Sequence, residues 1–246
     1  MKNLTIIYGD AAIFIPSRKA LVIADLHIGI EYEFYEKGIH IGSRTFALIG
    51  RIERLMKMAD IEEVFILGDV KHVVPSSPPS QRKDIEEFFE RLNELTNVTI
   101  IPGNHDGGLR NILPSADIKD SSGYVLEDES IGLIHGHRWP SEKVMQCSTI
   151  ITAHTHPTVS LRDGFGYEFF ERCWVVSKLD AEKVKKKYNS FADAEVIVMP
   201  AFNPICGGVP VNREGIAGPV SKMIDLDESD IYLLDGSALG KIKNLR

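Results

Sequence analysis

Short runs of apolar residues in this sequence stop abruptly at aspartate, asparagine or histidine. In Val98–Asp106, VTIIPGNHD, the run ends at Pro102-Gly103, and Asn104, His105 and Asp106 follow in succession. Such a run predicts a buried strand, and in a doubly wound sheet the carboxyl ends of the strands open into a shared crevice. A plain turn would also explain this composition, because Gly and Asn tolerate positive φ. The pattern occurs four more times along the chain, and this recurrence favours a functional site.

The five stretches end in groups that bind metal ions. They are Asp25-Leu26-His27, Gly68-Asp69, Gly103-Asn104-His105-Asp106, His135-Gly136-His137 and His154-Thr155-His156. Asp25 and His27 are two residues apart, as are His154 and His156, so in extended backbone both side chains of a pair leave the same face. Imidazole, carboxylate and amide oxygen suit Mn, Fe, Zn or Ni better than calcium, and thiolates of a structural zinc site are absent from these stretches. A lone histidine is more often structural, but five such ends together predict a metal centre.

Strands are expected to alternate with helices up to Leu113 and to dominate afterwards. Besides the run at Val98, the expected strands are Leu4–Tyr8, Ala11–Ile15, Ala20–Ala24, Glu63–Leu67, Tyr124–Leu126, Ile131–His135, Thr149–Ala153, Thr158–Leu161, Glu168–Val176, Val196–Met199 and Ile231–Leu234, with Gly9-Asp10 as a two-residue hairpin turn. The expected helices are one capped by Ser43 that runs to about Met58, Arg82–Leu95 after the breaker segment Pro75–Ser80, Gly108–Leu113 and Ala181–Tyr188. This pattern predicts an α/β fold, with residues 1–246 forming one domain of two packed sheets and helices outside.

The composition narrows the class of protein. The net charge of −7 argues against a general nucleic-acid coat protein, whose affinity comes from a basic surface, but it allows a nuclease with a locally positive site. Cys147, Cys173 and Cys206 lie far apart without paired spacing, which favours reduced thiols in the core of a cytoplasmic protein. Gly9-Asp10 interrupts the apolar residues near the N-terminus, so neither a leader nor a membrane span is expected.

The ordered motifs DLH, GD, GNHD, HGH and AHTHP resemble those of the calcineurin-like metallophosphoesterase superfamily, over Asp25 to His156. Within it, GDVKH at 68–72, HGHRWP at 135–140 and PAFNPICGG at 200–208 are similar to the small SbcD-related phosphoesterases, close to the ligase-associated phosphodiesterases. The resemblance implies a four-layer α/β sandwich of two mixed sheets flanked by helices. It also implies that the segment Pro200–Gly208 borders the active cleft.

The resemblance further implies a pair of divalent metal ions, with Mn²⁺ as the expected ion and Fe, Zn and Ni as alternatives. The implied ligands are Asp25, His27 and His156 for one ion, Asn104, His135 and His154 for the other, and Asp69 as a bridge between them. A hydroxide bridging the two ions would attack phosphorus, and His105, which is no ligand in this pattern, would act as general acid. Asp106 would orient His105 or raise its pKa.

Some residues beside the implied ligands are candidates for contact with a substrate: Lys71, His72, His137 and Arg138. His72 stands where many relatives have Asp, and His137 fits a substrate contact and a solvent-facing position equally well. Trp139 is expected to pack at a strand exit rather than to stack on a base, and the basic run Lys183–Lys187 is expected to be a solvated helix face.

The resulting prediction is a dinuclear metal-dependent phosphoesterase that hydrolyses phosphodiesters, with DNA or a nucleotide as the candidate substrate. A phosphomonoesterase acting on protein or nucleotide is the alternative enzyme. A metal-binding scaffold without activity is a third alternative, although every implied ligand position is filled. The oligomeric state is left open by the sequence.

Overall fold

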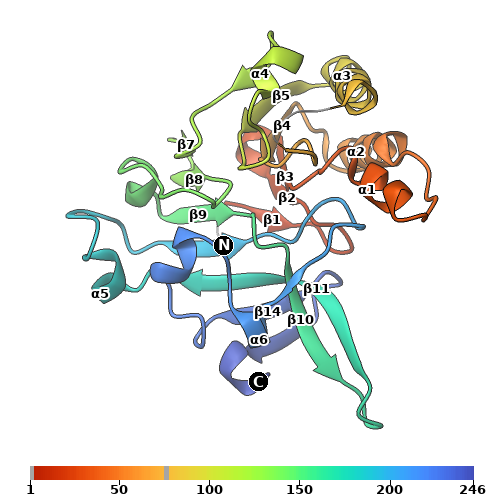
Figure 1. Ribbon diagram of the computed structural model, residues 1–246. Helices are drawn as coiled ribbons and strands as arrows, with labels where there is room; N and C mark the ends of the chain where they lie inside the picture. Colours follow the sequence, from red (N-terminus) through yellow and green to blue (C-terminus); the bar gives the residue numbers. More distant parts are fainter. Residues whose placement is uncertain (1–2, 75–77) are drawn as a thin grey trace.

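The computed structural model describes residues 3–74 and 78–246, and in these residues the chain forms two mixed β-sheets (Figure 1). The first sheet has the order β1-β2-β3-β4-β5-β6, with β3 to β6 parallel and the pairs β1–β2 and β2–β3 antiparallel. Its strands are β1 Thr5–Ile6, β2 Ile13–Ile15, β3 Ala20–Ala24, β4 Glu63–Leu67, β5 Asn97–Ile101 and β6 Asp117–Ile118. The parallel strands β3, β4 and β5 are three of the apolar runs that precede predicted ligands.

The second sheet is built from the later part of the chain in the order β13-β10-β11-β12-β9-β8-β7, and β14 and β15 join it through β11. Strands β8, β9 and β12 are parallel neighbours. The strands are β7 Tyr124–Leu126, β8 Ile131–Leu133, β9 Thr149–Thr152, β10 Pro157–Arg162, β11 Glu168–Lys178, β12 Glu195–Val198, β13 Val209–Pro210, β14 Asp230–Leu233 and β15 Ala238–Lys241. The short strands β6, β13 and β15 were not predicted, because two to four residues carry little periodicity. The β10–β11 hairpin projects from the body (Figure 1).

Helices flank the two sheets, which confirms the predicted α/β class. Helices α2 Thr45–Ala59 and α3 Pro79–Asn93 lie side by side against the first sheet (Figure 1). The others are α1 Ile30–Glu36, α4 Leu109–Ile112, α5 Ala181–Val184 and α6 Val211–Glu214, with 3-10 turns at Pro16–Arg18, Val144–Gln146, Pro219–Lys222 and Ile242–Asn244. Helix α3 begins within the predicted breaker segment 75–80, of which residues 75–77 lie outside the described residues. Among the described residues, no helix has the length and hydrophobicity needed to cross a lipid bilayer.

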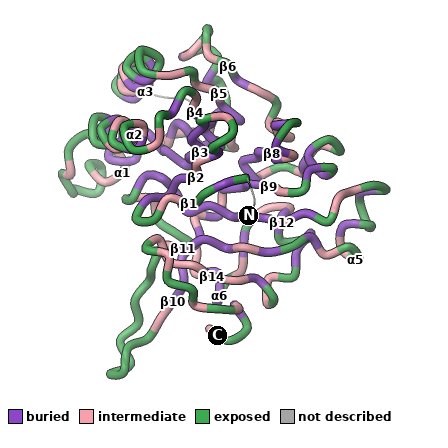
Figure 2. The backbone as a smooth tube through the Cα atoms, turned by 180° about the vertical axis from the view of Figure 1, so that it is seen from behind, coloured by how far each residue is buried: buried purple, intermediate pink, exposed green. Residues whose placement is uncertain are grey.

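Alternating side chains of the first sheet serve two separate cores. In β3, Leu21 and Ile23 join the core beneath α2 and α3, whereas Val22 faces the second sheet. Phe65 of β4 and the fully buried Trp174 of β11 belong to the same inter-sheet core. A sheet covered on both faces needs apolar residues at every position, which explains the continuous apolar runs in the sequence. Figure 2 shows these strands buried and the tip of the β10–β11 hairpin exposed.

The predicted N-terminal hairpin is present, but its turn is wider than two residues. Ile6 pairs with Ile13, and the backbone NH of Ile7 donates to the carbonyl of Ala12 at 3.0 Å. The reason is tertiary, because Asp10 is buried and forms a salt bridge with Arg51 of α2.

The prediction of Ser43 as N-cap of the second helix is wrong, because Arg44 occupies that position. The amide of Arg44 donates instead to the buried carboxylate of Glu31 at 2.9 Å. The predicted helix Ala181–Tyr188 is also shorter, since α5 ends at Val184. Tyr188 turns inward there, and its hydroxyl donates to the carbonyl of Pro140 at 2.6 Å. Both differences arise from contacts between distant segments.

Candidate metal centre

The residues that follow β3, β4 and β9 converge on one group of metal-binding side chains. It contains Asp25, His27, Asp69 and His156, and one donor atom of each lies within 4.8 Å of the others. The Nε2 atoms of His27 and His156 are 3.3 Å apart, and His156 Nε2 lies 3.4 Å from Asp25 Oδ1. His27 Nε2 lies 3.6 Å from Asp69 Oδ2. These donors surround a volume suited to a single cation.

A second group lies beside the first and shares Asp69 with it. Asp69, His135 and His154 place their donor atoms within 4.8 Å of one another. His135 Nε2 lies 3.2 Å from both His154 Nδ1 and Asn104 Oδ1, and 3.5 Å from Asp69 Oδ1. The two oxygens of Asp69 thus face two different groups. All seven residues predicted as ligands lie together in the structure.

The backbone is left-handed at many of these positions. Asp25, His27, Asp69, His154 and His156 have φ values of 54°, 43°, 49°, 71° and 48°. The backbone is therefore not extended at these residues, and the condition under which paired side chains share a face is not met. A positive φ destabilises a non-glycine residue, typically by about 1–3 kcal/mol, and strained backbone of this kind is common at functional sites. The convergence of the donors is achieved by sharp turns after the strands.

The donor set fits divalent cations. Asp25 is fully buried, and neither of its carboxylate oxygens has a hydrogen-bond partner within residues 3–74 and 78–246. Its nearest nitrogens are His156 Nε2, at 3.4 Å, and His135 Nδ1, at 3.6 Å. A buried carboxylate without a hydrogen bond is costly, and a bound cation would compensate it. Burial lowers the pKa of His27 to about 3, which keeps this imidazole in the neutral form that binds metal. Burial opposes protonation of His135, but the hydrogen bond to Asp69 and the charge of Asp25 outweigh it and raise its pKa to about 9.

Comparison with known proteins identifies the family. A family model described as calcineurin-like phosphoesterase matches residues 18–198. The chain belongs to this family.

Among solved structures, the nuclease MPE of Pseudomonas putida is 26% identical, with a TM-score of 0.62 over 94% of this chain and 93% of that one. Yfce, a phosphoesterase from E. coli, is 20% identical, with a TM-score of 0.41 over 90% and 97% of the two chains. No curated protein gives a significant match. The chain is therefore a hydrolase of the calcineurin-like phosphoesterase family, and the predicted superfamily is confirmed.

Two glycines of this phosphoesterase leave room for the donor atoms. A Cβ atom at Gly68 would lie 2.5 Å from His135 Nδ1, and one at Gly103 would collide with Asp69 Oδ1. Gly68 also has a positive φ of 69°. The backbone can therefore approach the ligands this closely only where no side chain is present.

We expect Gly103→Ala to lower the affinity for divalent metal at least about tenfold, the lower end of the effect seen when supports of metal ligands are altered. The added methyl group would displace Asp69, which belongs to both groups of donors. The measurement is elemental analysis after dialysis against Mn²⁺. Gly107→Ala is the control, because a Cβ atom there would meet nothing within 4 Å. Equal metal content in the two variants would contradict the expectation.

His105 lies at the edge of the centre with its ring held by backbone. Its Nδ1 lies 2.6 Å from the carbonyl oxygen of His72 and donates to it, so that Nε2 faces the centre, 4.0 Å from Asp69 Oδ2. The role predicted for Asp106, to orient this ring, is taken by the His72 carbonyl. The Asp106 carboxylate accepts instead from the amides of Val70, at 2.9 Å, and Gly103, at 2.7 Å. It ties together the two loops that carry Asp69 and His105.

The four candidates for substrate contact occupy different environments. Lys71 is 1% exposed, its Nζ donates to the Val73 carbonyl at 2.8 Å, and burial lowers its pKa. His72 Nδ1 lies 3.2 Å from His27 Nδ1, and His72 Nε2 lies 2.8 Å from a carboxylate oxygen of Glu33. The ring of His137 is half-buried, 5.2 Å from that of His135, whereas Arg138 is exposed. The structure thus brings His72 and His137 to the centre and holds Lys71 inside the protein.

Trp139 packs as the sequence predicted. Its ring meets that of Tyr188 edge-on with centroids 6.3 Å apart, and Lys187 Nζ lies 4.9 Å above it. The indole thus packs against the residues that follow α5.

The segment 200–208 borders the centre, as the family likeness implied. The amide of Phe202 donates to the carbonyl of Ala24 at 2.8 Å, and the buried Asn203 donates to the carbonyl of Leu26 at 2.8 Å. His156 Nδ1 donates to the carbonyl of Gly207 at 3.0 Å, which directs its Nε2 inward.

Cys206 belongs to the same segment and also lies at the centre. Its Sγ lies within 4.8 Å of donor nitrogens of His27 and His156. The sequence placed this cysteine in the core, and only the PAFNPICGG likeness pointed to its segment.

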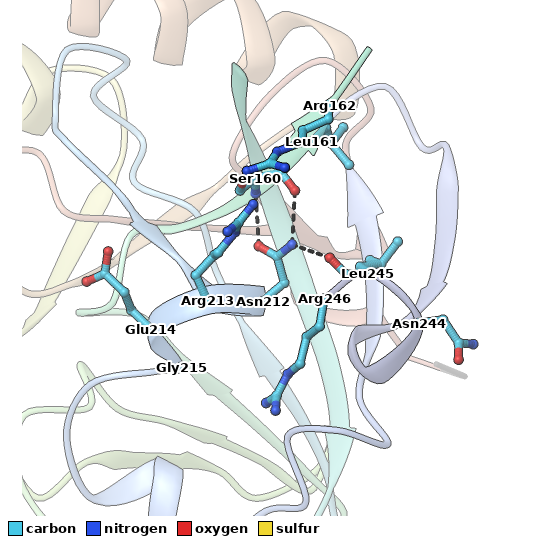
Figure 3. A pocket seen from close by; sticks show the side chains of 10 residues that line it. All are labelled: Ser160, Leu161, Arg162, Asn212, Arg213, Glu214, Gly215, Asn244, Leu245 and Arg246. Atoms are coloured by element: carbon cyan, nitrogen blue, oxygen red, sulfur yellow. Dashed lines mark hydrogen bonds between the residues drawn. The ribbon is translucent and has the colours of Figure 1, made fainter. Parts of the chain in front are cut away.

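A separate hollow of about 750 Å³ lies away from these donors, between β10, α6 and the C-terminus (Figure 3). Asn212 holds its wall together by accepting from the amide of Ser160 at 2.9 Å and donating to the carbonyl of Leu245 at 2.6 Å. Of the arginines that line it, Arg213 pairs with Glu168 at 2.7 Å and Arg246 with Asp227 at 2.6 Å. These pairs neutralise two of the three arginines that line the hollow, the third being Arg162, and the bonds of Asn212 show that the hollow lies at a joint between chain segments.

Proposed function

We propose that this phosphoesterase hydrolyses phosphodiesters, with a nucleic acid or nucleotide as substrate, and that it uses two divalent ions. The observation that carries the proposal is the position of Asp69, whose two carboxylate oxygens belong to two adjacent groups of donors. When bound, such a pair of ions activates water and neutralises the charge of a phosphoester. The protein's own residues supply the holding, orientation and proton transfer.

The proposed division of ligands follows the two groups. Asp25, His27 and His156 hold one ion, Asn104, His135 and His154 hold the other, and Asp69 contacts both. Two dications outweigh the charges of two carboxylates, and Asn104 adds no further negative charge. A centre of this composition stays positive and attracts phosphate locally, even in a chain with a net charge of −7.

His105 is proposed as the general acid. Its Nδ1 is engaged with the carbonyl of His72, and its Nε2 faces the centre, so a proton on Nε2 is directed toward the leaving-group oxygen. The Asp106 carboxylate supports this geometry by fixing the loop that carries His105. Asp106 is therefore proposed as a positioning residue. His72 and His137, at the edge of the same centre, are proposed contacts for the substrate.

The likeness to the Pseudomonas putida nuclease MPE, at 26% identity and a TM-score of 0.62, supports a diester substrate. The motifs GDVKH, HGHRWP and PAFNPICGG support membership of the SbcD-related branch. Mn²⁺ is the proposed ion, with Fe, Zn and Ni as alternatives, because the implied ligands combine imidazole nitrogen with carboxylate and amide oxygen. We also propose a cytoplasmic location, from the absence of paired cysteines in the sequence, and one catalytic domain over residues 1–246.

Hydrolysis of bis-(p-nitrophenyl) phosphate and of p-nitrophenyl phosphate with added Mn²⁺ tests the substrate class. We expect the diester to be hydrolysed at least about tenfold faster, a difference of about 1.4 kcal/mol in the barrier. Faster hydrolysis of the monoester would replace the proposal by a phosphomonoesterase. Stoichiometric metal without hydrolysis of either ester would favour the scaffold.

A further inference from the structure

Cys206 lies where a ligand of the first ion would lie. Its Sγ and one ring nitrogen each of His27 and His156 lie within 4.8 Å of one another. His27 and His156 also belong to the group that contains Asp25 and Asp69. Sulfur and nitrogen ligands of one ion, at about 2.3 Å and 2.0–2.1 Å from it, lie up to roughly 4.4 Å apart. The 4.8 Å limit exceeds this separation by only about 0.4 Å, so a small movement of the thiol brings it to coordinating range of the same point as the two imidazoles.

The fold directs the thiol to this point. The amide of Cys206 donates to the carbonyl of Asn203 at 3.2 Å, and Asn203 is itself fully buried and bound to the backbone of Leu26. On the other side, the carbonyl of Gly207 accepts from His156. The residues before and after Cys206 are thus fastened to the two stretches that supply Asp25, His27 and His156.

A second observation supports a cation at this position. Both carboxylate oxygens of Asp25 are buried without a hydrogen-bond partner in the described part of the chain. The sulfur of Cys206 lies 3.9 Å from the backbone carbonyl oxygen of Asp25. The Asp25 carboxylate and the Cys206 thiol are therefore both neighbours of His27 and His156.

We propose that Cys206 is a sulfur ligand of the ion held by Asp25, His27 and His156. The proposal rests on the proposed dinuclear centre and adds to it a difference between its two positions. On binding, the thiol would give its proton to solvent and form one metal–sulfur bond. A position with a thiolate favours Zn²⁺, Co²⁺ or Fe²⁺ over Mn²⁺, whereas the position of Asn104, His135 and His154 offers oxygen and nitrogen alone. The centre would then hold two different ions.

Cobalt absorption of the full-length protein tests this assignment. We expect the Co²⁺-loaded protein to show a sulfur-to-cobalt charge-transfer band in the near ultraviolet. Cys206→Ser should abolish the band while Co²⁺ remains bound. Cys147→Ser is the matched control, because that thiol is buried and contacts the carbonyl of Lys143 at 3.6 Å, and the band should persist there.

Competition between metals gives a second readout. With Zn²⁺ and Mn²⁺ offered together, Cys206→Ser should shift the Zn²⁺ to Mn²⁺ ratio of the first position at least about tenfold toward Mn²⁺. A wild-type protein that binds Co²⁺ stoichiometrically and hydrolyses the diester, but shows no charge-transfer band, would overturn the sulfur ligand and leave the proposed function standing. A protein that binds no Co²⁺, Zn²⁺ or Mn²⁺ would overturn the dinuclear centre and the sulfur ligand together.

Discussion

The Asp69→Asn variant is expected to lose most of its divalent metal and, with it, hydrolysis of bis-(p-nitrophenyl) phosphate. Asp69 Oδ2 faces His27 and Oδ1 faces His135, so one carboxylate serves both groups of donors. An amide offers one oxygen and no negative charge. Residues that only support ligands cost about 10- to 100-fold in metal affinity when they are replaced, and the loss at Asp69, a ligand itself in this proposal, should be at least that large. Elemental analysis and titration with Mn²⁺ measure this.

Asp60→Asn provides a closely matched control. Asp60 also has a left-handed backbone, with φ of 47° against 49° for Asp69, but its side chain is 84% exposed and pairs with Lys19 on the surface. The control should retain wild-type metal content. Thermal unfolding of the metal-free proteins separates loss of metal from loss of fold. A wild-type metal content in a folded Asp69→Asn protein would refute the shared role of this residue.

The His105→Asn variant is expected to keep both metal ions and to lose hydrolysis of diesters with poor leaving groups by about 10²–10⁴, the range for general acid catalysis. Hydrolysis of the p-nitrophenyl diester should fall less, because p-nitrophenolate needs little protonation to leave. The structural reason is that Nδ1 is held by the His72 carbonyl while Nε2 faces the centre. Rates on an alkyl and a p-nitrophenyl diester, with metal content, measure the difference.

Metal content decides between two roles for His105, because its ring also forms a possible donor group with His27 and His72. Loss of one ion from His105→Asn would make it a ligand instead of an acid. Normal turnover of the alkyl diester would exclude both roles. His40→Asn is the control, since that ring stacks edge-on against Tyr35, 4.7 Å between centroids, outside the donor groups.

The strands that carry the first ligands were predictable with little error. The bounds expected for β3, Ala20–Ala24, and β4, Glu63–Leu67, are those observed. Both strands are covered on two faces, so every residue in them contributes to the pattern. Strand β11 extends to Lys178, beyond the predicted end at Val176, and the short strands at the sheet edges were missed. Where a strand is partly exposed, its sequence predicts the first and last residues of the strand less well, because strand preference depends on the packing around each residue.

The environment of individual side chains was much less predictable. Lys71 stands next to predicted ligands and was a candidate for contact with a substrate, and the chain buries it with its Nζ against the carbonyl of Val73. Asp106 was expected to hold His105 and instead fastens the amides of Val70 and Gly103. In both cases the deciding partner is a backbone group, and backbone groups carry no signature in the sequence.

The sequence by itself determined which donors this chain supplies and in which order, because each donor group directly follows a buried strand. The tertiary structure decided how they meet. Left-handed turns at Asp25, Asp69 and His156 aim the side chains, and only the packed fold can maintain conformations that are locally unfavourable. It also brings Cys206 beside Asp25, 181 residues away in the chain. Local patterns report burial and periodicity, whereas a contact across that separation depends on how two sheets pack.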